Sequence, residues 1–286
     1  MASLPKISIV TPSLNQGTFI EDAILSVAKQ GYPNFEHIIV DGCSRDNTLA
    51  VLRSFPHLRW ISEPDQCQSD ALNKGFRMAS GDLVGWLNAD EYYLPGAFEA
   101  VAKCYVGNPA TDILYGDSIF VGAEGQLLRA KKAHVFSYAV LLYYGCFIPT
   151  DALFFRRHLI EQGFFIDIDY RIVMDFEYLV RLAASGKTFK YINRIIGAFR
   201  LTGSNLSLQS QKRRRERLLV QRTWSRIKLP DHGYDALAEL GRSYRVALKV
   251  LNGNYRGELR ALRRRGSETR WFRGDEGSET CAALLA

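Results

Sequence analysis

The sequence is poor in cysteine, and its cysteines form no pattern. The five positions are scattered, with no C-x-x-C pair: Cys43, Cys67, Cys104, Cys146 and Cys281. An odd, scattered set argues against a disulfide framework and against a zinc site, and it is typical of a reducing compartment. We therefore expect a cytoplasmic protein.

Long apolar segments are also missing. The longest uncharged run, residues 135–150, is shorter than the roughly 20 residues that cross a bilayer, and it contains Ser, Gly and Pro. We expect this run to be buried or interfacial. No basic-then-apolar segment opens the chain, so no secretory signal is predicted.

Two glycine-rich nucleotide motifs are absent. No G-x-G-x-x-G follows the first predicted strand, which excludes the usual NAD(P) fingerprint, and the P-loop pattern G-x-x-x-x-G-K-[ST] does not occur. A bound nucleotide would therefore have its phosphates held by something other than a glycine-rich loop.

What the first 90 residues do show is a regular alternation of strand and helix patterns. Strands are predicted over residues 6–11, 35–40, 58–61 and 83–87, and helices over 18–30, 48–55 and 69–79. Thr18 and Glu21 have the spacing of a capping box for the first helix. This alternation predicts an α/β fold with a largely parallel sheet, and 286 residues suit one large domain with an appendage.

Polar and acidic residues follow three of the predicted strands. These strand ends read Thr11-Pro12-Ser13, Asp41-Gly42-Cys43-Ser44 and Asn88-Ala89-Asp90-Glu91. Ligands of such sheets bind beyond the carboxyl ends of the strands, so these groups are expected to share one site. Two adjacent carboxylates indicate a divalent cation that itself carries the phosphates.

Three segments together resemble a known family. "IVTPSLNQGTFIEDAILSVAKQGYPNFEHIIVDGCSRDNT", "ISEPDQCQSDALNKGFRMASGDLVGWLNADE" and "MDFEYLVRLAASG" are similar, in order and spacing, to the inverting nucleotide-sugar glycosyltransferases of family 2, from about residue 7 to residue 207. The resemblance implies the GT-A fold, a UDP- or dTDP-sugar donor, a divalent metal (Mn²⁺ or Mg²⁺) and an Asp base for the acceptor hydroxyl.

The same resemblance implies a role for individual residues. Thr11 and Pro12 would line the nucleobase pocket and Asp41 would bind uracil or ribose, with Asp70 and Lys74 completing the nucleoside contacts. Asp90 would face the ribose or sugar, and Glu91 with Asp90 would hold the metal. Asp175 matches the catalytic base.

The residues around Asp175 support that role independently. Ile172, Phe176, Leu179, Val180 and Ala183 form an apolar helical stripe, so Asp175 lies near a helix start, where a carboxylate is favoured. Asp175 could equally be only a helix cap. Glu177 is expected to pair with Arg181 rather than to take part in chemistry.

The sequence departs from the family pattern at three positions. Glu91 replaces the usual Asp, Thr202 stands where a His is frequent, and Cys67 replaces a usual Gly. Arg200 and Ser204, near Thr202, could still contact phosphate. An alternative function therefore stays open, a catalytically weak sugar-nucleotide-binding partner subunit. A nucleotidyltransferase would need a glycine-rich basic loop after the first strand, which "TPSLNQG" does not offer.

The positive charge is concentrated near the C-terminus. Residues 200–273 hold 19 Lys/Arg against 6 Asp/Glu, whereas residues 1–199 hold 18 against 21. We expect a glycosyltransferase domain over residues 1–205, a basic helical region over 206–265 and a disordered tail over 266–286. The helices could dock on an anionic inner-leaflet surface near a lipid-linked acceptor. Alternatively, they could form a solvated helical hairpin, or a helix could pack on the acidic main domain.

No nucleic-acid partner is predicted, because nucleic-acid binding calls for aromatics interleaved with basic residues on a compact module, and only Trp224 and Trp271 qualify. The resemblance makes cell-surface polysaccharide or glycolipid synthesis plausible, whereas the donor sugar and the acceptor are not specified. Residues 110–170, which are rich in aromatics, are expected to shape the choice of acceptor.

Overall fold

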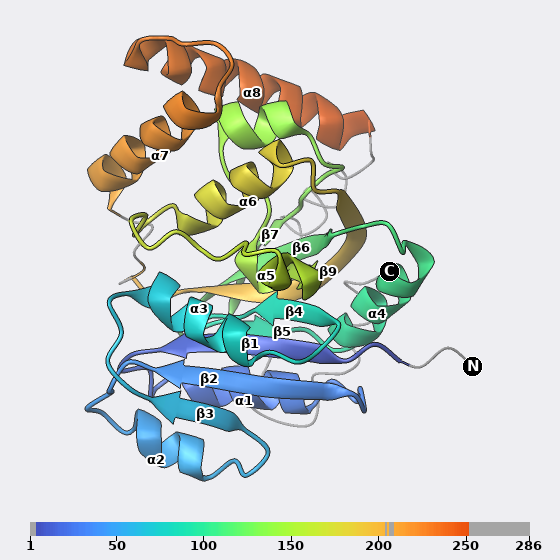
Figure 1. Cartoon of the computed structure of the whole chain (residues 1–286), viewed down its shortest axis with the longest axis vertical. Coiled ribbons are helices and arrows are strands. Elements are labelled where there is room, and N and C mark those ends of the chain that lie inside the picture. The colour runs from blue at the N-terminus through green and yellow to red at the C-terminus, as the bar shows by residue number, and fades with distance from the viewer. Residues whose placement is uncertain (1–3, 204, 206–208, 252–286) are drawn as a thin grey trace.

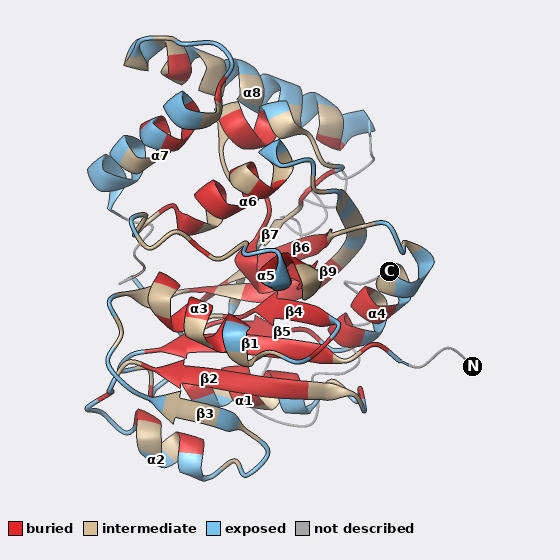
Figure 2. Ribbon diagram, viewed as in Figure 1, coloured by how far each residue is buried: buried red, intermediate tan, exposed pale blue. Residues whose placement is uncertain are grey.

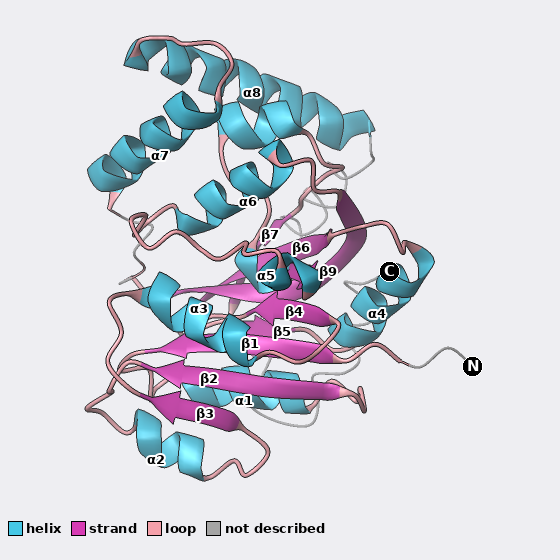
Figure 3. Ribbon diagram, viewed as in Figure 1, coloured by secondary structure: helices cyan, strands magenta, loops and turns pink. Residues whose placement is uncertain are grey.

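A computed structural model describes residues 4–203, 205 and 209–251 (Figure 1). The described strands form one nine-stranded sheet in the order β3-β2-β1-β4-β8-β6-β9-β5, with β7 paired to β6. Helices cover both faces of this sheet, and a further group of helices lies beyond one edge (Figure 3). The α/β prediction is confirmed.

The first four long strands are parallel, as predicted. They are β1 (Ile7–Ser13), β2 (Phe35–Asp41), β3 (Arg59–Ser62) and β4 (Leu83–Trp86). The register pairs Ser13 with Asp41 and Asp41 with Ser62. Because the strands run the same way, their carboxyl ends meet at one edge of the sheet.

The second half of the sheet is mixed. It contains β5 (Tyr92–Tyr93), β6 (Ile113–Gly122), β7 (Leu127–Lys131), β8 (Leu153–Arg156) and β9 (Phe189–Leu201). β8 is antiparallel to β4 and β6, β9 is parallel to β6, and the short β5 pairs antiparallel with β9. β5 follows Glu91 directly, so the acidic pair lies between two strands of the sheet.

Six α-helices of the described chain precede β9. They are α1 (Ile20–Ala28), α2 (Thr48–Arg53), α3 (Gln68–Met78), α4 (Ala97–Gly107), α5 (His158–Glu161) and α6 (Met174–Ala184). The interior strands are buried on both faces (Figure 2). α3 lies so close to β1 that a Cβ on Gly75 would be 2.3 Å from Val10 Cγ1, so only glycine fits at this contact.

The predicted capping box of the first helix is wrong. α1 begins at Ile20, its N-cap residue is Phe19, and no side chain caps it. The amides of Phe19 and Ile20 instead donate to the carbonyl of Gln16, each at 2.9 Å. A backbone carbonyl of the preceding turn therefore accepts the hydrogen bonds that the Thr18 side chain was expected to accept.

Two helices follow β9, α7 (Ser210–Trp224) and α8 (Asp231–Leu251). The helix predicted in the basic region is thus present as α7. Three of its arginines pair with α8, Arg214 and Arg217 with Asp235 and Arg222 with Asp231, which ties the two helices into a hairpin. The hairpin packs on α6 and on a short π-helix, η1 (Val140–Tyr144).

The hydrophobic run of residues 135–150 is largely internal, as predicted, since Val140, Leu141, Leu142, Phe147 and Ile148 are buried. No helix in the described part of the chain is long and apolar enough to cross a membrane. The predicted tail over residues 266–286 lies outside the described residues, as do residues 206–208 and 252–265 of the predicted basic helical region.

Candidate active site

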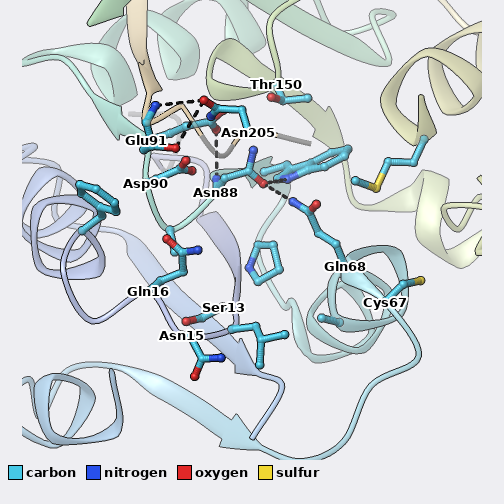
Figure 4. A pocket seen from close by; sticks show the side chains of 18 of the residues that line it. Ser13, Asn15, Gln16, Cys67, Gln68, Asn88, Asp90, Glu91, Thr150 and Asn205 are labelled. Carbon is cyan, nitrogen blue, oxygen red and sulfur yellow. Dashed lines mark hydrogen bonds between the residues drawn. The ribbon is translucent and has the colours of Figure 1, made fainter. Parts of the chain in front are cut away.

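A cleft of about 600 Å³ opens at the carboxyl edge of β1 and β4 (Figure 4). Its walls come from distant parts of the chain: the end of β1 and the loop behind it, the start of α3, the β4–β5 connection, the start of α6 and the end of β9. Parallel strands bring the first of these segments together, and the crossing of β9 brings the last.

The loop after β1 forms the floor of the cleft and is held from below. The amide of Asn15 donates to Ser44 Oγ at 2.7 Å, and that of Gly17 donates to Asp46 Oδ2 at 2.9 Å. Asn15 has a φ of 53°, a left-handed conformation that Asn tolerates. The loop is therefore shaped by the β2–α2 connection before any ligand arrives.

Asp41 lies beside this loop and is fully buried. Its carboxylate accepts hydrogen bonds from the amide of Ser44 at 2.9 Å, from the Ser44 hydroxyl and from Ser62 Oγ at 2.6 Å. Asp65, which does line the cleft, lies next to it, since a Cβ on Gly42 would be 2.4 Å from Asp65 Oδ2. Burial raises the pKa of Asp65, Lys74 lowers it, and the charges of Asp70 and Asp41 raise it further.

Asn88 organises the centre of the cleft. Its Oδ1 accepts from Gln68 Nε2 at 2.7 Å and from Trp86 Nε1 at 2.8 Å, and its amide donates to Glu91 Oε2 at 3.1 Å (Figure 4). One asparagine thus joins the start of α3, the end of β4 and the acidic pair.

Glu91 is 1% exposed although it lines the cleft. Its Oε1 has no hydrogen-bond partner among the described residues. Burial raises the pKa of Glu91 well above its ordinary value, and the nearby carboxylates of Asp151 and Asp90 add to the effect. A buried carboxylate oxygen without a partner is costly unless a cation or a proton meets it.

Asp90 and Glu91 fit a hard cation on these grounds. Their donor atoms are oxygens, both residues line the cleft, and Glu91 Oε1 is buried without a hydrogen-bond partner among the described residues. Among the described residues no group of three or more His, Cys, Asp or Glu side chains could hold a metal by itself. Magnesium-type ions are commonly held by one or two carboxylates together with substrate phosphates, which matches a pair rather than a complete cage.

Arg200 fixes the acidic pair from behind. It is 4% exposed, and it donates to the carbonyl of Asp90 at 3.1 Å and to the carbonyl of Ala123 at 2.7 Å, and pairs with Asp22 at 2.5 Å. Its charge also lowers the pKa of Asp90, although burial has the larger effect and raises it. The sequence suggested Arg200 as a phosphate contact, whereas the structure uses it within the protein. Ser204, named with it, is outside the described residues.

Thr202 lies on the wall of the cleft where the family often has His. Its amide donates to Asn205 Oδ1 at 3.0 Å, and Asn205 Nδ2 donates to the carbonyl of Arg200 at 3.0 Å. This wall is therefore neutral and built from a threonine and an asparagine.

Asp175 faces the same cleft from the first turn of α6. Burial raises the pKa of its carboxyl, while the amide of Phe176, the charge of Lys131 and the Cys146 thiol lower it in part. Burial and the charge of Asp175 in turn raise the pKa of Cys146. The predicted pair of Glu177 with Arg181 is present at 2.8 Å, which leaves Asp175 as the acid of α6 that reaches the cleft.

The predicted site residues divide into two groups. Pro12, Asp90, Glu91 and Asp175 line the cleft. Four others do not form its lining: Thr11, bound to His37 at 3.0 Å, the buried Asp41, and Asp70 and Lys74. Lys74 binds Glu63 at 2.9 Å and the carbonyl of Pro64, so Asp70 and Lys74 hold the loop that carries Asp65.

Several lining residues were missed from the sequence, among them Asp65, Gln68 and Arg171, whereas Asn88 was expected at the site as part of a strand end. Asp65 and Gln68 lie within two residues of Cys67, inside the segment "ISEPDQCQSDALNKG" that carries part of the family resemblance. Their place in this segment could have marked them as site residues. Arg171 lies in a loop with no motif, and only the fold brings it to the cleft.

Comparison with known proteins gives the class. The family model for Glycosyl transferase family 2 matches residues 8–181. An uncharacterised glycosyltransferase of Nostoc sp. (strain PCC 7120) is 27% identical over 258 residues, covering 83% of this chain and 80% of the relative.

Two solved structures share the fold. Staphylococcus aureus TarS 1–349 in complex with UDP has a TM-score of 0.60 at 17% identity, covering 87% of this chain and 74% of that one. The mannosyltransferase PcManGT of Pyrobaculum calidifontis, in complex with GDP-Man and Mn²⁺, has a TM-score of 0.60 at 18% identity, covering 99% and 79%.

The chain therefore belongs to glycosyl transferase family 2 and is a glycosyltransferase. The predicted family and the predicted GT-A fold are both confirmed.

Proposed function

We propose that this enzyme transfers a sugar from a nucleoside diphosphate donor, UDP- or dTDP-linked, to an acceptor hydroxyl with inversion. The observation that carries the proposal is that Asp90, Glu91 and Asp175 line one cleft, although Asp175 is more than 80 positions further along the chain. Inversion needs a base across the sugar from the leaving diphosphate, and these acids come from different walls.

The nucleoside would lie over the end of β1. Pro12 and Ser13 line that part of the cleft, with Asp41 and Asp65 at its side. In this arrangement Thr11 and Asp41 support the pocket from within the sheet, and Asp70 and Lys74 fix the loop of Asp65. If the ligand displaced the hydrogen bond of Ser62 or Ser44 at the Asp41 carboxylate, it would make the direct contact that the family pattern assigns to this aspartate.

Asp90 and Glu91 would hold the Mn²⁺ or Mg²⁺ ion that accompanies the diphosphate. When bound, such an ion neutralises the negative charge that develops on the leaving diphosphate. The protein contributes two carboxylates: Asn88 binds the Glu91 carboxylate, and Arg200 binds the backbone carbonyl of Asp90.

Asp175 would take the proton of the acceptor hydroxyl as that oxygen attacks the anomeric carbon. Its raised pKa brings the carboxylate nearer to the working pH, where a general base is more effective. Ile172 and Met174 form an apolar wall beside Asp175. This wall favours contact with the apolar face of a sugar ring and excludes bulk water.

Asp175→Asn tests the catalytic part of the proposal. The variant is expected to bind UDP with unchanged affinity and to lose transfer by about 10²–10⁴-fold, since a positioned base contributes that much. UDP or dTDP release, measured over a panel of nucleotide sugars, supplies the assay. Asp169→Asn, an exposed acid outside the lining of the cleft, is the matched control and should turn over as the wild type. Full turnover by Asp175→Asn refutes the assignment.

Measurements of UDP binding and donor release also test the alternative function, a sugar-nucleotide-binding subunit. The neutral wall of Thr202 and Asn205 motivates that alternative, because it offers no imidazole to a metal. UDP affinity that does not change with Mn²⁺, together with no release from any donor, would favour a binding subunit over an enzyme.

The acceptor is proposed to be lipid-linked and presented at an anionic membrane surface, in polysaccharide or glycolipid synthesis. α8 exposes apolar side chains at helical spacing, with Leu240 66% and Leu251 82% exposed and Tyr244 between them. Lys212 and Arg215 are exposed on α7. An exposed apolar stripe on one helix combined with exposed basic side chains on its partner helix is compatible with binding to anionic lipid.

Sedimentation with vesicles tests the membrane proposal. Wild-type protein should bind vesicles that contain an anionic lipid and not neutral ones, and Leu240→Glu should weaken binding severalfold. Val106→Glu, at a 55% exposed position on α4, is the control. Equal binding of all three proteins to anionic vesicles would contradict a docking role for α8.

A further inference from the structure

Helix α7 binds the backbone that leads into α6. Glu216 Oε2 accepts hydrogen bonds from the amides of Arg171 at 3.2 Å, Ile172 at 2.8 Å and Val173 at 3.1 Å. The amides at a helix start lack partners inside the helix, and a carboxylate there is favoured by the helix dipole and by charge-assisted hydrogen bonding. Asp175 is the second residue of α6.

The segment that Glu216 holds is a wall of the cleft. Arg171 and Ile172 both line the cleft, and Arg171 Nη1 donates to the carbonyl of Gln66 at 2.8 Å, on the donor side. Glu216 therefore binds one side of a segment whose other side lines the cleft.

The second half of α7 holds the neighbour of Asp175. Gln221 is fully buried, and its Nε2 donates to the carbonyls of Leu142 at 2.9 Å and Tyr143 at 3.1 Å, in η1. The chain after η1 carries Cys146, whose thiol contributes to the pKa of Asp175. Both supports of Asp175 thus rest on α7.

We infer that Glu216 is a positioning residue for Asp175, supplied by a helix that lies beyond the matched family region of residues 8–181. The inference deepens the proposed function and rests on it. Three hydrogen bonds to one carboxylate oxygen fix the entry of α6, and with it the distance from the Asp175 carboxylate to the acceptor hydroxyl. A displacement of about 1 Å at a reacting group can cost about 10²-fold in rate.

The test compares Glu216→Ala and Glu216→Gln with wild type in the full chain. Transfer kinetics give kcat and the donor KM, and amide hydrogen exchange reports on residues 170–176. Glu216→Ala should lower kcat by about 10- to 100-fold with a donor KM within about twofold of wild type. Glu216→Gln keeps an acceptor oxygen and the side-chain shape, so it should fold as the wild type and recover most of the rate. Glu239→Ala, on the exposed side of α8, is the control.

Two measurements keep the outcomes separate. Faster exchange at residues 170–176 with a lower kcat supports the inference. An unchanged kcat, or a raised donor KM as the main effect, overturns it, and so does unchanged exchange in Glu216→Ala. If no nucleotide sugar is turned over by the wild type, the proposed function fails, whereas the exchange experiment still decides whether Glu216 holds the entry of α6.

Discussion

Glu36 gives a prediction whose size follows from the structure. It is the second residue of β2, at the edge of the sheet opposite the cleft, and it is 8% exposed. Its Oε1 accepts from Ser8 Oγ at 2.6 Å and from the amide and hydroxyl of Ser80, each at 2.8 Å. Its Oε2 accepts from Arg59 Nη1 at 2.6 Å. One carboxylate thus joins three strands to the α3–β4 turn.

These contacts determine how much the Glu36 carboxylate contributes to the free energy of folding. Burial would raise the pKa of Glu36, but the hydrogen bonds from Ser8, Ser80 and Arg59 outweigh it and lower the pKa from 4.5 to about 2. At about 1.4 kcal/mol per pH unit, this difference corresponds to about 3 kcal/mol of folding free energy. Because the folded pKa is the lower one, the contribution is complete above pH 4.5 and is lost as the pH falls towards 2.

Urea denaturation of wild type and Glu36→Gln over a pH series measures this contribution. The variant should be less stable by about 3 kcal/mol at neutral pH, and the gap should narrow below about pH 4.5. Glu124→Gln, at an exposed turn position, should show neither effect. A gap that stays constant as the pH falls, or one below about 1 kcal/mol at neutral pH, refutes the reasoning.

Two further predictions concern the cleft. The pKa of Glu91 is raised by burial and by the carboxylates of Asp151 and Asp90, so below this pKa a proton competes with a cation for the side chain. Calorimetric Mn²⁺ affinity in the presence of UDP should therefore rise with increasing pH as Glu91 loses its proton, and Glu91→Gln should weaken binding and flatten this dependence. A flat wild-type profile would count against Glu91 as a ligand. Arg200→Lys cannot reach Asp22 and both carbonyls at once, so urea denaturation should show a loss of about 2 kcal/mol. Unchanged stability would mean that these contacts contribute little.

Much of the sheet could be predicted because its strands carry local signals. β1, β2 and β4 are short apolar runs bounded by turns, and each was found to within about two residues. β5 has no such signal, since a strand of two residues exists only through its pairing with β9, where Tyr92 meets Ala198. The insertion of β8 between β4 and β6 is likewise set by contacts between distant segments.

The same distinction applies to the site. Asp90, Glu91 and Asp175 were found because each stands in a motif or beside a strand end. Arg171 has no local mark, because only the packing of distant segments brings the loop before α6 to the cleft. Glu216 is the single acid among the basic residues of α7. The net charge of the segment therefore gives no indication of its role.

The β4–β5 connection has a consequence for ion choice. Asp90 and Glu91 lie between two strands of one sheet, with the Asp90 carbonyl bound by Arg200 and the Glu91 carboxylate bound by the Asn88 amide. With the Glu91 carboxylate and the Asp90 backbone both held, the pair has little freedom to spread around a larger ion with more ligands. Selection by ionic radius follows: the site should favour Mg²⁺ and Mn²⁺ over Ca²⁺, which prefers a roomier and more flexible set of oxygens.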